Sequence, residues 1–500
     1  MNNSFDFSEY TRQSAKGIII IYFKNVYAFI KKSWVFIPML VIGKTSPDKI
    51  QKMIWGLIII LLFLLIKSIL DYFYFKFKIV DNHFVLKEGV LNKKQLSIPF
   101  ERIQNINFKQ NFIQQLINVT QVEVETAGAK KTEISIKAIE REKAEAIKSQ
   151  IFGTNTINED AIAKKDVNKP ILQISLTELV KISITENHLK SFGIFVGFLF
   201  MIYSQIKDAF KDFTLKDTVG VDIEQQAPNT LIGFGIIVII AFIIGLIISF
   251  VRVFLIHFDL AVYIKNKTLE ITQGLLTKRH HILKKEKVQY ITITTNPLKQ
   301  ILGISGVNFK QANSAKAKVL KLIRIVGCEN KHLDNVKNML YNEHTLANKT
   351  SFKPHKYYIF QMFFRSFIVI ALLNVVVLLP MIYDPETPKD FNLFYWNFLL
   401  IPIVIFLILL KYKKTYFKFN DELLIKGFGQ IGTKTTYFEY FKIQSIKTKQ
   451  TIFQKRKGIK DLFLVTAVGK IKLPCIKNKQ ANQLYNYFLY QTEISTKEWM

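Results

Sequence analysis

Long apolar segments alternate along this chain with stretches in which apolar and polar residues alternate one by one. Residues 231–251 carry no charge and are long enough to cross about 30 Å of hydrocarbon as a helix. We predict four more spans, and a weaker candidate that follows an amphipathic stretch at 17–30. The four spans are 53–66 (extending to 70), 192–206, 367–383 and 393–410, and the weaker candidate is 34–43. The pattern therefore predicts six spans in three pairs, the first beginning either as one kinked span or as an interfacial helix leading into a short one.

The period changes from an apolar run to strict alternation after each pair. Phe75, Phe77 and Ile79 alternate with more polar positions, which is typical of a half-buried strand, and 258–264 and 415–419 show a similar change. Short strand-like runs follow in the first block at 84–87, 95–98, 121–125 and 133–136. Each block closes with a helical pattern, at 139–151, 332–341 and 479–489. Each unit is predicted to be a small curled antiparallel sheet plugged by a C-terminal helix.

The three blocks are copies of one another. Setting Gly89, Gly274 and Gly429 in one column aligns the chain through residues 127, 312 and 467 without a gap. A glutamine then recurs in the order cation, β-branched residue, Gln, any residue, Ile, at Gln104, Gln289 and Gln444. Apolar columns agree as well, at Leu91/Leu276/Ile431, Ile98/Leu283/Phe438, Val119/Ile304/Ile459 and Val122/Val307/Leu462.

Two spans followed by a block with this glycine and glutamine pattern resemble the bacterial pleckstrin-homology-like (PH-like) membrane-flanked domain family. The triplicated form resembles its YdbT type, and an amphipathic lead-in at 174–181 is a further family-like feature. The resemblance implies an α+β membrane protein with three helical transmembrane hairpins, each followed by a small PH-like β-barrel with a C-terminal helix. The copies depart from one another, since Asn118 stands where the others have Gly303 and Gly458, so a ligand site can survive in one copy alone.

These patterns divide the chain into eight predicted segments. The N-terminal segment and transmembrane pairs are 1–71, 188–257 and 358–412, the linkers are 154–187 and 343–357, and the PH-like domains, called here the first, second and third repeats, are 72–153, 258–342 and 413–491.

The composition and net charge of the chain indicate what kind of partner it binds. The chain has 500 residues, 49% hydrophobic and 21% charged, with a mean hydropathy of +0.18, so part of it belongs in a membrane and part in water. Its 69 Lys and Arg against 38 Asp and Glu give a net charge of +31, which implies an anionic neighbour. The apolar spans favour an anionic phospholipid membrane over nucleic acid.

Charge also predicts an orientation. The loops at 211–228 and 384–392 are net acidic, whereas cations follow each pair. The positive-inside rule then places the repeats and both termini in the cytoplasm of a bacterium, on a multi-pass protein of the inner membrane.

Basic clusters are the candidate anionic-lipid contacts, and general leaflet contact is favoured over a defined headgroup pocket. They are Lys278, Arg279, Lys284 and Lys285 in the second repeat, and Lys455, Arg456 and Lys457 in the third. The repeated glycines and glutamines are interpreted as structural, each glutamine amide tying a turn to backbone groups.

Chemistry beyond binding is not predicted. His280 and His281 lack a third metal ligand at useful spacing, Cys328 and Cys475 fit buried free thiols, and no catalytic or cofactor motif occurs. Asn374 is expected to make a hydrogen bond between helices, and the spans lack the buried charges usual in ion-coupled transporters.

Two functions follow from these observations. The first is a non-enzymatic membrane scaffold in envelope maintenance, whose repeats bind anionic lipid or a protein partner, for example another membrane-flanked PH-like protein. The alternative is a lipid or small-molecule transporter gated by the repeats. A membrane enzyme would need catalytic residues that the sequence does not offer.

Overall fold

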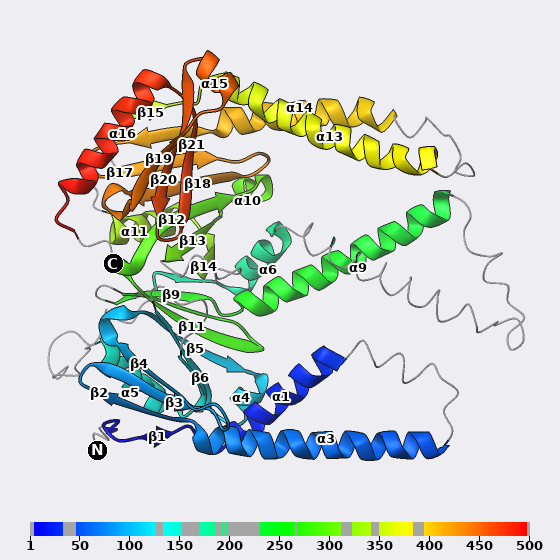
Figure 1. The fold of residues 1–500 in the computed structure, drawn as a ribbon, viewed down its shortest axis with the longest axis vertical. Coiled ribbons are helices and arrows are strands. Elements are labelled where there is room, and N and C mark those ends of the chain that lie inside the picture. The colour runs from blue at the N-terminus through cyan, green and yellow to red at the C-terminus, as the bar shows by residue number, and fades with distance from the viewer. Residues whose placement is uncertain are drawn as a thin grey trace, which may run out of the picture. The chain divides into compact units, whose positions relative to one another are not determined.

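A computed structural model describes most of the chain (Figure 1). The residues described are 5–33, 47–126, 134–152, 170–186, 193, 197, 231–265, 268–311, 323–341, 350–383 and 395–497. They form two compact units. The first unit comprises Met1–Glu125, Thr132–Tyr263 and Glu270–Ile282, and the second comprises Thr126–Lys131, Ile264–Leu269 and Leu283–Met500.

The described part of the first unit holds two antiparallel sheets and six α-helices. One sheet has the order β1(Thr11–Arg12), β2(Lys76–Val80), β3(His83–Glu88), β4(Lys94–Pro99). The other has the order β7(Ile134–Ile139), β6(Thr120–Thr126), β5(Ile103–Asn111), β11(Thr277–Lys284), β10(Thr268–Gln273), β9(Ala261–Lys265), β8(Leu172–Gln173). The helices are α1(Gly17–Ser33), α3(Pro47–Tyr74), α4(Phe112–Leu116), α5(Arg141–Phe152), α6(Leu176–Thr185) and α9(Leu231–His257). A core around Phe77, Phe84 and Ile106 fills the space between the sheets and α5.

The second unit repeats this plan. Its larger sheet has the order β14(Ile323–Cys328), β13(Ser305–Gln311), β12(Val288–Thr295), β18(Thr433–Glu439), β17(Leu423–Phe428), β16(Tyr416–Phe419), β15(Thr350–Phe352). Its smaller sheet is β19(Ser445–Lys449), β20(Ile459–Thr466), β21(Gly469–Lys477). The helices are α10(Pro297–Ile301), α11(Asn330–Leu340), α13(Tyr357–Tyr383), α14(Trp396–Lys414), α15(Ile452–Arg456) and α16(Asn478–Glu493). Phe488 of α16 packs on Tyr440 in a core with Phe417 and Phe438.

The larger sheets join consecutive repeats. In the first unit β5 of the first repeat pairs with β11 of the second, and in the second unit β12 of the second repeat pairs with β18 of the third. The sequence pattern predicted one small sheet for each repeat, and this was wrong. Each repeat contributes strands to two sheets, because a strand at the edge of a sheet leaves backbone groups that a neighbouring strand can satisfy.

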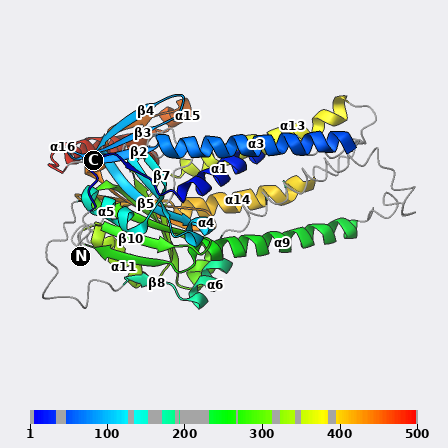
Figure 2. The same ribbon diagram turned by 90° about the horizontal axis from the view of Figure 1, so that it is seen from below.

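Apolar helices leave both units. Figures 1 and 2 show α1 beside α3 and α13 beside α14. Asn25 Nδ2 donates to Ser68 Oγ at 2.9 Å in the first pair. In the second, Asn374 and Asn397 exchange hydrogen bonds of 3.2 and 3.0 Å, which confirms the predicted contact of Asn374 between helices.

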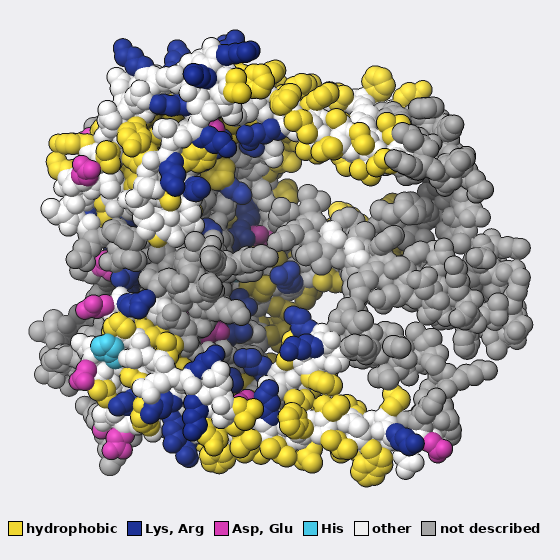
Figure 3. Space-filling model, viewed as in Figure 1, with side chains coloured by type: hydrophobic (Ala, Val, Ile, Leu, Met, Phe, Trp, Pro, Cys, Tyr) yellow, Lys and Arg dark blue, Asp and Glu magenta, His cyan; other side chains and the backbone are white. Residues whose placement is uncertain are grey.

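Two helices of the described part are long and apolar enough to cross a membrane, over Gln51–Tyr74 and Tyr357–Val376, and Phe242–His257 of α9 is a shorter apolar helix. Figure 3 shows the apolar side chains that cover α3, α13 and α14. The predicted span at 34–43, most of the one at 192–206 and the loop at 384–392 lie outside the described residues.

Candidate functional site

A glycine turn opens the second hairpin of every repeat. Gly89, Gly274 and Gly429 have φ values of +101°, +108° and +150°, which residues with a side chain rarely adopt. A Cβ on any of them would lie 2.1 to 2.2 Å from the carbonyl oxygen three residues later. The glycine column of the sequence therefore exists because only glycine can close this turn.

The tip of each turn presents an apolar side chain to the surroundings. Leu91 is 100% exposed, Leu276 49% and Ile431 61%. In the sequence these residues form an aligned apolar column, and residues of such a column are usually buried. Here the side chains point into the surroundings instead, because the glycine conformation fixes the backbone of the turn.

The turns of the second and third repeats lie at the ends of apolar helices. The amide of Gly274 donates to the carbonyl of Phe258 at 2.7 Å, and that of Leu275 donates to Leu255 in the last turns of α9 at 3.0 Å. In the third repeat Lys414, the last residue of α14, donates to the carbonyl of Ile431 at 2.6 Å. The exposed tip is thus placed where the chain leaves an apolar helix.

A second apolar feature recurs in the short helices α4, α10 and α15, which the sequence analysis missed. Each begins at an Asn or Thr whose side chain accepts a hydrogen bond from the third residue of the helix, at Asn111, Asn296 and Thr451. The helices expose large apolar side chains, and the fractions are 57% for Phe112, 71% for Leu116, 52% for Leu298, 79% for Ile301, 74% for Ile452 and 62% for Phe453. The signal available in sequence was the Asn or Thr followed three residues later by Gln in two of the copies.

In the first unit the short helix and a turn are in contact. Gln115 of α4 donates to the carbonyls of Leu275 and Leu276 at 3.1 and 3.3 Å, and Lys16, just before α1, donates to Ile117 at 3.2 Å. The exposed apolar residues of α4 and of the next repeat's turn therefore form one surface beside α1 and α9.

A groove of about 450 Å³ lies between α9 and β11 in this unit. Its walls are apolar apart from Thr277 and two guanidinium groups, those of Arg252 and Arg279, and the other lining residues are Ile247, Ile248, Val251, Leu255, Ile256 and Leu276. An apolar groove that carries two guanidinium groups suits an amphiphile with an anionic head.

The predicted basic residues fall in different places. Lys278 and Arg279 are exposed at the start of β11, beside this groove, whereas Lys284 and Lys285 lie half-buried at the other end of the strand and in the turn after it. Burial, with the nearby charge of Lys287, lowers the pKa of Lys284. Lys455 and Arg456 lie in α15 and Lys457 ends that helix, and all three are exposed next to Ile452 and Phe453.

The repeated glutamines also differ in their surroundings. Gln289 lies within β12 and is 1% exposed, whereas Gln444 precedes the edge strand β19 and is exposed. Gln104 lies within β5, so in the first two copies the glutamine belongs to a strand.

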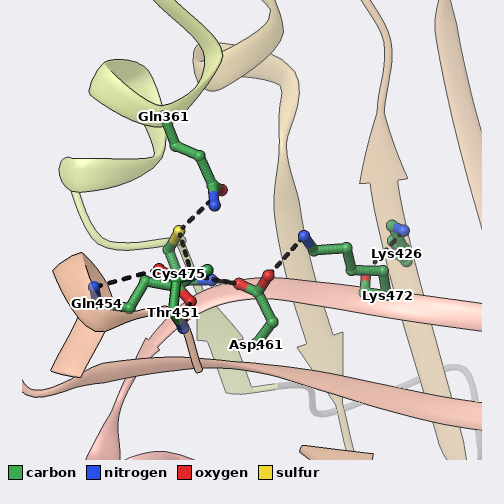
Figure 4. A network of polar contacts seen from close by, with 7 residues as sticks. All are labelled: Gln361, Lys426, Thr451, Gln454, Asp461, Lys472 and Cys475. Carbon is green, nitrogen blue, oxygen red and sulfur yellow. Dashed lines mark hydrogen bonds and ion pairs between the residues drawn. The ribbon is translucent and has the colours of Figure 1, made fainter. Parts of the chain in front are cut away.

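A polar network connects α13 to the third repeat (Figure 4). Asp461 accepts hydrogen bonds from the amide of Cys475 at 2.8 Å and from Gln454 at 3.1 Å, and it pairs with Lys472. The thiol of Cys475 lies 3.6 Å from the amide oxygen of Gln361 in α13. Burial raises the pKa of Cys475 to about 11, so this thiol is structural, and both cysteines are buried and free as predicted.

The paired histidines make protein contacts. His280 binds Glu270 at 3.1 Å and His281 binds the amide oxygen of Asn107 at 2.8 Å. No cluster of three metal-ligating side chains occurs among the residues that the structure describes.

A family model for the bacterial PH domain matches residues 31–154, 210–342 and 366–492. The chain belongs to the bacterial PH domain family. The three matches confirm the predicted family and the triplication of its PH domain. The chain is also similar to the UPF0699 transmembrane protein YdbT of Bacillus subtilis (strain 168), with 23% identity over 415 residues, which is 80% of each chain. It is therefore a membrane-associated PH-domain protein of the YdbT type.

Proposed function

We propose that this protein is a non-enzymatic scaffold of the bacterial inner membrane, whose three PH domains rest on the cytoplasmic leaflet and bind anionic lipid there. Three helical hairpins, with both termini in the cytoplasm, would place all PH domains on one side. The acidic loops, the cations after each apolar segment and the apolar helices support this arrangement. A scaffold role in envelope maintenance would use the remaining surfaces for a protein partner.

The observation that carries the proposal is the exposed apolar tip of each glycine turn, fixed at the end of an apolar helix in the second and third repeats. Burying one Leu or Ile side chain in lipid stabilises by about 1.5 to 3 kcal/mol. A cation near an anionic leaflet contributes about 1 kcal/mol. The apolar side chains of the tips and the short helices would thus insert into the lipid. The cations, chiefly Arg252 and Arg279, would give the preference for anionic lipid.

The test replaces each tip by a fluorescent probe. Leu276→Trp and Ile431→Trp are made singly in a background where the four native tryptophans are phenylalanine, and the full chain is placed in nanodiscs. Lipids brominated near the top of the acyl chain should quench both probes, since quenching requires contact with the interface. Tyr490→Trp is the matched control, because Tyr490 is equally exposed at 60% on α16, away from α13 and α14 in Figure 1. Quenching no greater at the tips than at this control would overturn the proposal.

A second measurement tests lipid selection. Arg252→Ser with Arg279→Ser should reduce the enrichment of anionic lipid around the purified protein, whereas Arg141→Ser, at an exposed ion pair on α5, should leave it unchanged. Flux of lipid or small solutes through proteoliposomes would instead favour the transporter alternative.

A further inference from the structure

A pocket of about 330 Å³ lies on one face of the larger sheet of the second unit. It lies across the junction at which β12 of the second repeat pairs with β18 of the third, and the tip of the β20–β21 hairpin closes one side. Its polar lining comes from Thr292, Thr294, Asn308, Lys310, Lys426, Lys434, Thr436 and Lys470. This volume is in the range of small-ligand sites.

Strand register puts these side chains in rows. Thr292 lies opposite Thr436, and Thr436 lies opposite Lys426 on the other side. Asn308 lies opposite Thr292 from β13. Since side chains of paired residues share a face, one row across the sheet presents an amide, two hydroxyls and an ammonium.

The pocket carries only positive charge. Lys310, Lys426, Lys434 and Lys470 line it, and no carboxylate is among its lining residues. Lys426 Nζ donates to the carbonyl of Lys472 at 2.8 Å, which satisfies one of its three hydrogens. Asp461 is already engaged by Lys472, Cys475 and Gln454, as Figure 4 shows with Lys426 nearby.

Partial burial of Lys310 and Lys426 is costly without a counter-charge, whereas Lys434 and Lys470 are exposed. Burial, with the neighbouring charge of Lys472, lowers the pKa of Lys426 to about 8, and burial also lowers the pKa of Lys310. An unfavourable electrostatic energy of this kind is expected in a binding site whose negative charge is supplied by the ligand.

Donors that fit an oxyanion stand beside the cations. The hydroxyls of Thr292 and Thr436 lie 3.2 Å apart, so one donates to the other and a hydrogen remains to donate elsewhere. Asn308 is 8% exposed and lies in the same row as the two threonines, opposite Thr292. Hydroxyl and ammonium donors that line one pocket are a set that recognises phosphate oxygens.

The equivalent place in the first unit is not built this way. The aligned columns hold Glu123 for Asn308, Glu125 for Lys310 and Ile271 for Lys426. Asn105 donates to Glu125 at 3.2 Å and Gln121 donates to Glu123 at 3.0 Å. The fold therefore does not require a cluster of lysines at this position.

We infer that the lysine pocket between β12, β13, β17, β18 and β21 binds a phosphate group, carried either by a lipid headgroup or by a free phosphate compound. The inference goes beyond the proposed function and does not depend on it, because neither the tip residues nor the residues of the groove at Arg279 line the pocket.

Calorimetric titration of the full chain in phosphatidylcholine nanodiscs tests this inference. Inorganic phosphate is titrated in one arm, and phosphatidic acid is added to the nanodisc in the other, at constant ionic strength. Binding in the first arm identifies a free phosphate compound, and binding only in the second identifies a headgroup. No binding in either arm overturns the inference.

Variants assign the binding to the pocket. Lys426→Met should weaken binding about tenfold or more, because one charge-assisted contact is lost. Lys418→Met is the matched control, since Lys418 is an exposed lysine on the adjacent strand β16. Lys434→Ser, at an exposed position of the pocket, provides a second variant if Lys426→Met does not fold. Equal weakening in the control and in the pocket variants would show binding by general surface charge and would also overturn the inference.

Discussion

The first unit places Glu123, Glu125 and Glu270 on the columns where the second unit places Asn308, Lys310 and Ile425. Both units build the same seven-stranded sheet by joining the last strands of one repeat to the first strands of the next. In the first, cations such as Lys148 meet carboxylates of the sheet. In the second, three lysines of the sheet line one pocket together with Lys470 of β21. The two units thus pair the strands of consecutive repeats in the same way but carry different charges on the sheet. The strand pairing is therefore structural, and the charged side chains on the sheet can differ between units and take part in binding.

The glycine turns are common to both units, and substitutions there are expected to have the largest effect on stability. Gly274→Ala and Gly429→Ala should each lower the free energy of unfolding by about 3 kcal/mol or more, because a Cβ would meet a carbonyl oxygen at 2.2 Å and the φ is unfavourable. Denaturant unfolding in detergent checks this. Gly56→Ala, in α3 with open space around it, should cost nothing. A large difference between the two turn variants would contradict a common plan.

Charge balance in the first sheet can be tested at Glu270, with a smaller effect. Burial opposes ionisation of Glu270, but hydrogen bonds from His280 and Lys148 outweigh it and lower its pKa to about 2. Glu270→Gln should cost about 2 kcal/mol near neutral pH, because Lys148 loses its counter-charge. Glu145→Gln, at an exposed pair with Arg141, should cost about 0.5 kcal/mol or less.

The same carboxylate predicts a pH dependence. Its pKa is lower in the folded state than in the unfolded chain, so its contribution is complete above about pH 4.5 and disappears as pH falls toward about 2. Thermal unfolding across this range should show a steeper acid loss in the natural protein than in Glu270→Gln. Parallel curves would contradict the assignment.

The smallest effect is expected in the second sheet, and it has the opposite sign. Lys426→Met should raise stability by about 1 kcal/mol without phosphate, because a buried cation facing Lys310, Lys434, Lys470 and Lys472 is removed. The lowered pKa means that the stability of the natural protein rises as pH increases from about 8 toward 10.5, whereas the Met variant lacks this rise. Thermal unfolding at several pH values measures both, and a less stable Met variant would show that the charge is not penalised.

Much of the fold was visible in local patterns. Alternation in the sequence predicted strands at 75–80 and 84–87, observed as β2 and β3, and the helical periods predicted α5, α11 and α16. The amphipathic lead-in at 174–181 is α6, which begins at Ser175 with a reciprocal cap from Glu178. These elements were predictable because propensity and period act within a few residues.

The joining of repeats was not predictable in this way. Whether β12 pairs with β18 depends on strands far apart in the chain. The aligned glutamine is buried at Gln289 and exposed at Gln444, a difference that the repeated motif does not reveal. The exposure of the tips was also not predictable from sequence, because an aligned apolar column such as that of Leu276 is typical of buried core residues. The lysine pocket needs Lys310 and Lys426 brought together by register, and no single stretch of sequence contains it.

The unfinished edge of the last sheet has an evolutionary consequence. β19 has the position that β5 and β12 occupy at the junctions, yet among the described strands it ends its sheet. It bears Lys447 and Lys449 where β12 has Thr292 and Thr294. Lysines on a bare edge discourage pairing with foreign strands. If these two lysines were replaced and the repeat were duplicated once more, β19 could pair with the added repeat in the way that β5 and β12 pair with theirs.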